Sequence, residues 1–460
     1  MAQAVTKEKT KKEQNIDMLN GPLAGKIIRF TLPIMFSGVL QLLFNAADIV
    51  VVGRFAGSNA LAAVGSNTAL INLIVNLLVG LSVGSAVTVA FYYGAQDMPQ
   101  VKETIHTSIA IGLIGGVICG VVGFFLSGTL LELMGSPEEI INLAALYLKI
   151  YFLGLPAMAL YNYGSAILRS LGDTKRPLIF LVIGGIVIVI LNVILVAAFH
   201  LDVAGVAIAT VVSQTISALL TLRQMMIMDP EISLELRKIR VSKHKMGRIM
   251  KIGIPAGIQS TVFSLSNVLI QSSINSFGAL AVAGSSAASN IEGFIYIAMN
   301  SFYQAAQTFT SQNVGGKRYD RISKVCRNCV CMVTGIGLIL SILVMVFKVP
   351  LLSIYLPDNA EAIEFAIIRM KMVVTVYFIC GIMDVMSGML RGMGESVLPM
   401  VVSMVGSCLL RIIWLYTVFA ADRTLNVLFF SYPVTWVITT TAHAFCYQHV
   451  KRRVIARSKA

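Results

Sequence analysis

Charged residues are scarce in this sequence. They make up 13% of its 460 positions, whereas 57% of the positions are hydrophobic and the mean hydropathy is +0.81. Ordinary soluble domains contain about 25% charged residues, so a soluble fold of this composition would expose too much apolar surface. The composition therefore excludes a soluble globular protein. The apolar stretches are continuous rather than alternating, which excludes a membrane β-barrel as well.

Several signatures of chemistry are also missing. No G-x-x-x-x-G-K-[ST] run occurs, so the chain has no Walker-type phosphate cradle. The five His are scattered and form no H-E-x-x-H motif. The seven Cys give no disulfide framework, and Cys326-x-x-Cys329-x-Cys331 has no nearby His or carboxylate to complete a metal site. We expect neither an enzyme nor a cofactor, and any transport must be driven by an ion gradient or a separate subunit.

What the chain does contain is a series of apolar runs of about 20 residues or more, the length that crosses a bilayer as a helix. We count twelve runs and predict an all-α membrane protein. The predicted spans are 27–52, 60–93, 104–127, 141–170, 177–199, 203–227, 249–274, 280–312, 326–348, 362–391, 398–420 and 425–448.

The distribution of basic residues predicts the topology. Only Arg54, Lys348 and Arg423 fall in predicted outside loops, whereas most of the 36 Lys and Arg, including Lys7, Lys9, Lys11 and Lys12, fall on the other side. Because cytosolic loops are enriched in Lys and Arg, we expect both termini in the cytosol of a cell-membrane protein. This pattern explains the net charge of +14 without nucleic acid. The charged N-terminal stretch lacks the apolar centre of a secretory signal.

The chain is an internal repeat. Leu168 to Pro177 (LRSLGDTKRP) matches Leu390 to Pro399 (LRGMGESVLP), and the offset of 222 also relates Pro33 to Pro255. Since each half has an even number of spans, the repeat is parallel, with its axis along the membrane normal. The predicted organisation is a tail at 1–26, a six-helix lobe at 27–227, a basic linker at 228–248, a second lobe at 249–448 and a tail at 449–460. We expect a monomer in the lipid bilayer.

These motifs together resemble the multidrug and toxic compound extrusion (MATE) family. The resemblance is carried by Pro33, Gln41, Asn45 and Asp48 in the first span, LRSLGDTKRP after the fourth, Gln312-Asn313-Val-Gly-Gly after the eighth, and LRGMGES after the tenth. It implies a V-shaped pair of six-helix lobes. It also implies export of amphipathic, mainly cationic organic compounds in exchange for H⁺ or Na⁺.

Asp48 is the leading candidate for the coupling site. Acidic groups inside the bilayer are costly and are usually functional, and only Asp48, Glu292 and Asp384 fall inside predicted spans. A carboxylate in a low-dielectric surrounding can bind a proton or can coordinate sodium with neighbouring oxygens. The alternative is a structural ion pair with Arg54 or Lys149.

The resemblance implies partners for Asp48, and this sequence departs from the family pattern at one of them. One branch of the family accompanies this Asp with an Asn and, one turn later, an Asp in the fifth helix. Asn192 matches the first, but Val196 stands at the second position. With Thr210 of the sixth helix, Asp48 and Asn192 would form a weakly charged cage in which sodium selectivity is doubtful.

The second lobe offers further candidates for a substrate site or a second cation site. They are Glu292 and Asp384, with the polar residues Gln259 and Asn267 of the seventh span and Gln41 and Asn45 of the first. The alternatives are mutual neutralisation with Arg369, Lys371 and Arg411, and for Asp384 a partner in Arg391, seven residues on along the same helical face.

A lipid-linked oligosaccharide or polysaccharide flippase is the second functional hypothesis, because relatives in the wider superfamily share the two-lobe plan. Such a protein would favour a cationic central cavity for pyrophosphate-linked substrates. The membrane-embedded bases, four, and acids, three, are nearly balanced, which argues weakly against it.

Overall fold

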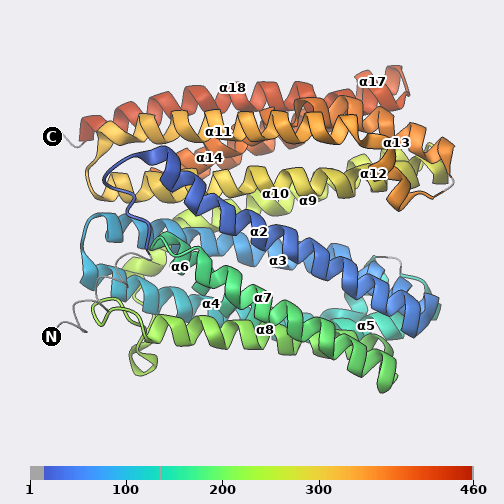
Figure 1. Cartoon of the computed structure of the whole chain (residues 1–460), viewed down its shortest axis with the longest axis horizontal. Helices are drawn as coiled ribbons and strands as arrows, with labels where there is room; N and C mark the ends of the chain where they lie inside the picture. Colours follow the sequence, from blue (N-terminus) through green and yellow to red (C-terminus); the bar gives the residue numbers. More distant parts are fainter. Residues whose placement is uncertain (1–14, 135, 358, 458–460) are drawn as a thin grey trace. The chain divides into compact units, whose positions relative to one another are not determined.

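The computed structural model describes residues 15–134, 136–357 and 359–457, which form helices joined by turns (Figure 1). Lys7, Lys9, Lys11 and Lys12, used above for the topology, lie outside the described residues. The chain divides into two compact units. Unit 1 contains residues 15–17 and Phe36–Gly257, and unit 2 contains Met18–Met35 and residues 258–457.

Unit 1 is built from the following helices, with two π-helical turns. They are α2 (Leu23–Val51, from Phe36 on), η1 (Val52–Ala56), α3 (Gly57–Gly94), α4 (Met98–Leu133), α5 (Glu138–Leu153), α6 (Leu155–Ser170), α7 (Lys175–Asn192), η2 (Val193–Ala198), α8 (Asp202–Met226), the 3₁₀ turn η3 (Leu236–Lys238) and α9 (Lys243–Asn275, up to Gly257).

Unit 2 repeats this plan with the remaining helices. They are the first part of α2, the second part of α9, α10 (Ala279–Gly315), α11 (Tyr319–Val346), α12 (Lys348–Tyr355), α13 (Ala360–Val373), η4 (Val374–Val376), α14 (Tyr377–Gly392), α15 (Val397–Ser403), η5 (Met404–Leu409), α16 (Leu410–Tyr416), α17 (Val418–Ala421) and α18 (Leu425–Arg457).

Each predicted span coincides with a helical run, although not every run is a straight apolar helix. In the described part of the chain, nine helices are long and apolar enough to cross a membrane, and ten if α5 and α6 count as one span. The predicted span 141–170 is broken at Gly154, where α5 and α6 meet at 49°. Pro156, near the start of α6, has no backbone N–H to continue the helical hydrogen bonds of α5, which explains the break.

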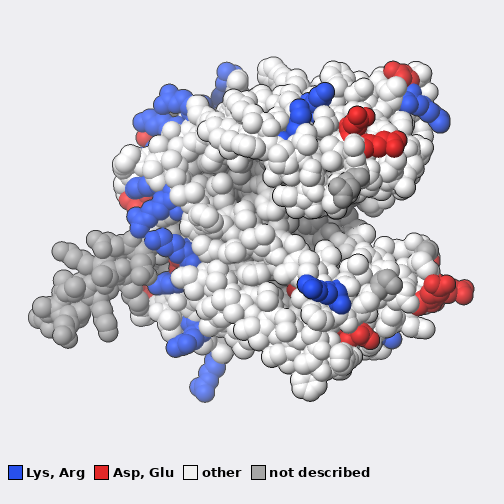
Figure 2. Space-filling view, turned by 45° about the vertical axis from the view of Figure 1, so that its right-hand side comes forward, with Lys and Arg blue, Asp and Glu red and all other residues white. Residues whose placement is uncertain are grey.

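Inside each unit the helices approach closely at small residues and present large apolar side chains outward. On α4, a Cβ added to Gly120 would lie 2.7 Å from the Phe152 carbonyl oxygen of α5, whereas Phe125 and Ile118 are 77% and 57% exposed. This arrangement reverses that of a soluble protein and suits a surface solvated by lipid. Figure 2 shows Lys and Arg gathered toward one end of the helices and little charge between the ends.

The repeated motif forms the same turn in both units. Gly172 and Gly394, which are 222 positions apart, adopt φ values of +93° and +87° after α6 and α14. Side chains with a Cβ rarely adopt this left-handed conformation, so both turns require glycine. In unit 1 the Asp173 carboxylate then accepts the Arg176 backbone N–H at 3.2 Å and caps α7. The repeat in the sequence is thus also a repeat in backbone geometry.

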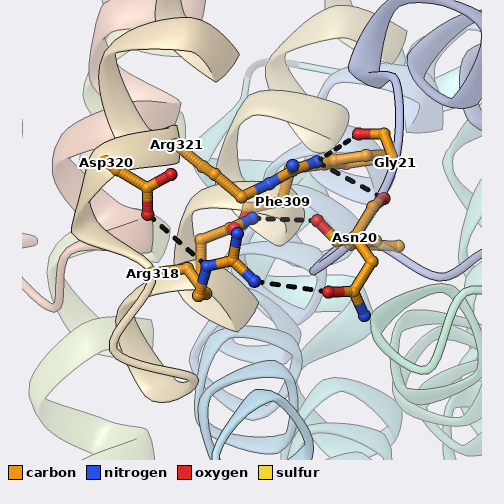
Figure 3. Close-up of polar contacts among 8 residues, drawn as sticks. Asn20, Gly21, Phe309, Arg318, Asp320 and Arg321 are labelled. Atoms are coloured by element: carbon orange, nitrogen blue, oxygen red, sulfur yellow. Dashed lines mark hydrogen bonds and ion pairs between the residues drawn. The ribbon is translucent and has the colours of Figure 1, made fainter.

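Residues 18–21 are held by the turn between α10 and α11 of unit 2 (Figure 3). Arg321 Nη2 donates to the Gly21 carbonyl oxygen at 2.9 Å, and Arg318 Nη1 donates to Asn20 Oδ1 at 3.3 Å. Asn313 Nδ2 donates to the Met18 carbonyl oxygen at 3.2 Å. These bonds satisfy backbone carbonyls ahead of α2 and attach to unit 2 a segment that the sequence analysis placed in the N-terminal tail.

Candidate functional site

The candidate coupling site in unit 1 is formed by α2, α7 and α8. Asn192, the last residue of α7, donates from Nδ2 to Asp48 Oδ1 at 2.5 Å. Asn192 is 1% exposed, and its Oδ1 atom has no protein partner in the described part of the chain. Thr210 of α8 donates to the Val206 carbonyl oxygen at 2.9 Å, which leaves its hydroxyl oxygen able to accept a further bond. The predicted pairing of Asp48 with Asn192 is therefore present.

Both partners lie beside irregular backbone. The π-helical turn η1 begins four residues after Asp48, and η2 begins directly after Asn192. Such π-bulges occur frequently at functional sites because they shift the side-chain register of a helix. Val196, in the position of a second carboxylate, lies within η2 and is fully buried in an apolar cluster with Val203 and Val206. The site thus contains one carboxylate rather than two.

Tyr147 is a member of this site that the sequence analysis missed. Its hydroxyl group hydrogen-bonds to Thr210, and it lies within electrostatic range of Asp48. Tyr147 also stacks on Tyr151 one turn later on α5, with ring centroids 6.2 Å apart. The pair is visible in the sequence as two Tyr at i and i+4 in an apolar helix, a pattern that core packing explains equally well.

The rival ion pairs for Asp48 do not form. Arg54 and Lys149 are exposed, and within residues 15–134 and 136–357 no salt bridge joins either of them to Asp48. Lys149 is exposed and lies close to the break between α5 and α6. Asp48 is therefore compensated by an amide rather than by a cation.

The donor set around Asp48 is poor in charge. Among the described residues, no group of three or more His, Cys, Asp or Glu is placed to hold a metal ion. A cation at Asp48 would meet one carboxylate, and the unpartnered Asn192 Oδ1 is the neutral oxygen on the residue bonded to it. Such a set fits a proton or a weakly held monovalent cation rather than a divalent one.

Gln41 and Asn45 lie on the same face of α2 as Asp48, because positions i, i+4 and i+7 of a helix align. Both are exposed, whereas Asp48 is partly buried. The structure therefore brings the three predicted residues of α2 onto one polar stripe. Asn267, predicted for the other lobe, is also exposed, on α9.

Glu292 of unit 2 is engaged in a buried ion pair. Arg369 donates from Nε to Glu292 Oε1 at 2.9 Å and from Nη2 to Oε2 at 2.7 Å, and its Nη1 donates to Ser285 at 2.8 Å. The Glu292 and Arg369 side chains are only 7% and 9% exposed. Both carboxylate oxygens are occupied in this bidentate geometry, which is the strongest form of such a pair.

Asp384 has a different environment. Its Oδ2 atom has no hydrogen-bond partner in the part of the chain that the structure describes, and no salt bridge involves it there. Arg391, expected as its neighbour along the helix, donates instead to Gln259 at 2.7 Å and to the Tyr303 hydroxyl at 2.5 Å. Arg411 lies over the Tyr432 ring at 4.0 Å. Asp384 and Gln259 thus belong to one polar region of unit 2, in which Arg391 hydrogen-bonds to Gln259 and lies within electrostatic range of the Asp384 carboxylate.

The comparisons with known proteins match nearly the whole chain. The MatE family model matches residues 33–195 and 255–417, which are again 222 positions apart. The probable multidrug resistance proteins YoeA and YpnP of Bacillus subtilis are 28% and 27% identical, over 81% and 86% of this chain and 82% and 88% of their own. A crystal structure of MATE in complex with MaL6 superposes with a TM-score of 0.89 at 21% identity, covering 97% of this chain and 100% of that one.

The two matched segments cover most of the chain and reproduce the internal repeat. They support about twelve membrane spans, as the apolar runs predicted, and they confirm a transporter rather than an enzyme. The chain belongs to the MATE family of multidrug efflux transporters and is a multi-pass membrane protein that acts on small molecules.

Proposed function

We propose that the chain exports amphipathic, mainly cationic organic compounds by alternating access, in antiport with a cation that binds at Asp48. The observation that carries this proposal is the partly buried Asp48 carboxylate, bonded to Asn192 and without a cationic partner in the described residues. A carboxylate compensated only by an amide can take up a positive charge and release it again. A carboxylate held by Arg cannot do so as readily.

The proton is the favoured coupling ion. A buried Val occupies position 196, so the site lacks the second carboxylate that would strengthen the coordination of sodium. A single carboxylate with neutral Asn192 and Thr210 oxygens is sufficient to bind a proton, which needs one acceptor. Sodium needs several oxygens at once, and unit 1 supplies few of them here.

The substrate site is proposed along the polar stripe of Gln41 and Asn45 and, in unit 2, around Asp384, Gln259 and Asn267. Asp384 offers an oxygen without a protein partner among the described residues, which suits a cationic ligand. Glu292 remains a predicted member of this site, although both its oxygens are taken by Arg369. We place both termini in the cytosol, because Lys and Arg gather at that end of the helices (Figure 2).

Dye transport in inverted membrane vesicles tests the proposal. A pH gradient and a sodium gradient are imposed separately on wild type, Asp48→Asn and the control Glu139→Gln, an exposed acid on α5. We expect the pH gradient to drive transport in wild type and in the control, and Asp48→Asn to lose it. Transport by Asp48→Asn equal to that of wild type under both gradients would refute the coupling role. Movement of lipid-linked sugar without any movement of dye would favour the flippase hypothesis.

A further inference from the structure

The linker between α8 and α9, residues 227–242, is folded onto unit 1. Ile232 and Leu234 are 7% and 2% exposed and pack with Val101 and Ile105 of α4. The Leu234 N–H also donates to the Met225 carbonyl oxygen at 2.9 Å. Sequence analysis predicted only a basic connection here. The structure instead gives the linker its own apolar anchor on the first turns of α4.

Polar contacts fasten the second part of the linker to the same turns. Lys102 binds Glu235 at 2.6 Å and donates to the Pro230 carbonyl oxygen at 2.9 Å. The Thr107 hydroxyl accepts the Ser242 N–H at 3.2 Å. The linker is therefore attached to α4 at both of its ends.

His106 lies at the centre of this attachment and uses both ring nitrogens. The Glu235 backbone N–H donates to Nε2 at 3.0 Å, and Nδ1 lies 2.7 Å from the Lys102 carbonyl oxygen. An amide N–H can only donate and a carbonyl oxygen can only accept. These two partners fix a neutral ring that carries its hydrogen on Nδ1. His106 is 4% exposed, so water cannot easily replace either partner.

We propose that His106 is a pH-sensitive latch, which holds the linker on α4 when neutral and releases its polar part when protonated. A proton on Nε2 turns the acceptor of the Glu235 N–H into a second donor. Two donors then face each other in a buried site, so the bond from the Glu235 N–H is lost, whereas the bond from Nδ1 to the Lys102 carbonyl oxygen can remain. The apolar anchor at Ile232 and Leu234 does not titrate and remains in place.

The groups around this end of α4 do not compete with His106 as the sensor. They are Lys102 and Glu103 on α4, Glu235 and Lys238 on the linker, Lys245 on α9, which hydrogen-bonds to Gln100 of α4, and Tyr92 on α3, whose ring faces the Lys245 ammonium. Hydrogen bonds from Lys102 and then Lys238 lower the pKa of Glu235 to about 2, so it stays ionised. Histidine is the side-chain type that changes its charge in the physiological pH range, and His106 is the histidine of this cluster.

Hydrogen exchange of the full-length protein in lipid nanodiscs tests the latch. Protection of the Glu235 amide is measured by mass spectrometry at pH 7.5, 6.5 and 5.5 and corrected for intrinsic exchange. Because protonation of Nε2 is compatible only with the open form, we expect protection of the Glu235 amide to fall several-fold between pH 7.5 and pH 5.5.

His106→Gln is the test variant, because its amide oxygen can accept the Glu235 N–H but cannot take up a proton. We expect its protection to be independent of pH. His244→Gln, an exposed His on α9, should behave as wild type. Equal protection of the wild type at pH 5.5 and 7.5, or an equal loss in His106→Gln, would overturn the proposal. If His106→Gln does not fold, the wild-type pH series decides alone. Exchange does not require transport, so the result is independent of the coupling assignment.

Discussion

Removal of the Glu292 charge tests whether the buried Glu292–Arg369 ion pair of unit 2 serves stability or transport. In Glu292→Gln, the Arg369 guanidinium keeps its position beside Ser285 and the Phe429 ring but loses its counter-charge. Both side chains are more than nine-tenths buried, so water cannot compensate the cation. The variant therefore leaves an uncompensated charge inside unit 2.

The expected cost follows from this burial. Breaking a buried pair by removing one partner costs about 3–5 kcal/mol, whereas replacing both partners by apolar residues of similar volume is often near neutral. For a unit of about 200 residues, each kcal/mol shifts the unfolding temperature by about 2–4 °C. We expect Glu292→Gln to lower the unfolding temperature by about 6–20 °C. The double variant Glu292→Met with Arg369→Met should recover most of this loss.

Thermal unfolding of the detergent-purified protein, followed by the size-exclusion peak that survives heating, measures the effect. Glu364→Gln, an exposed acid on the same helix as Arg369, is the matched control and should shift the midpoint by less than 2 °C. A stable Glu292→Gln protein that has lost transport would refute this reasoning and assign Glu292 to the substrate or cation site. A destabilised single variant rescued by the double variant would assign Glu292 to stability.

Two further predictions concern unit 1. In Gly84→Ala the new Cβ would lie 2.1 Å from the Ile249 carbonyl oxygen, a backbone atom that cannot turn away, whereas Gly128 has nothing within 4 Å. Thermal unfolding should show that Gly84→Ala lowers the free energy of unfolding by about 1–3 kcal/mol, whereas Gly128→Ala changes it little. Equal effects of the two substitutions would contradict the close approach of α3 and α9. Glu235 stabilises the fold when ionised, and its lowered pKa of about 2 places the loss of this stability below pH 4. In the His106→Gln background, where the linker stays attached, Glu235→Gln should therefore lower the unfolding temperature equally at pH 8 and pH 5.5, and less at high salt; a difference that disappears at pH 5.5 would contradict this.

The fold was largely predictable because its signals are long and repeated. Continuous apolar runs, the 222-residue offset and the paired LRSLGD and LRGMGE motifs are local features that survive without knowledge of packing. Gly172 and Gly394 show why the motif repeats, since both occupy left-handed turns. What the runs could not reveal is the break at Gly154, because hydropathy does not report the direction of a helix.

The candidate site was predictable only where partners follow from charge and family position. Asp48 and Asn192 were expected together and are bonded. Tyr147 was missed because an apolar helix with a Tyr pair looks like ordinary core packing. Arg391 was expected as a neighbour of Asp384 and lies within electrostatic range of it, but its hydrogen bonds go to Gln259 and Tyr303 on other helices. Spacing within one helix describes its own neighbours and says nothing of competing partners on another.

If the proposed proton antiport is coupled at Asp48 alone, the single carboxylate beside buried Val196 limits the energetics of exchange. A site that accepts one proton returns one elementary charge for each monovalent organic cation exported, so such a cycle moves no net charge across the membrane. The membrane potential then performs no work on the cycle, and only the proton concentration ratio drives it. Each pH unit supplies about 1.4 kcal/mol and supports at most a tenfold substrate gradient. A second carboxylate would have allowed two positive charges per substrate and would have added the electrical potential as a driving force.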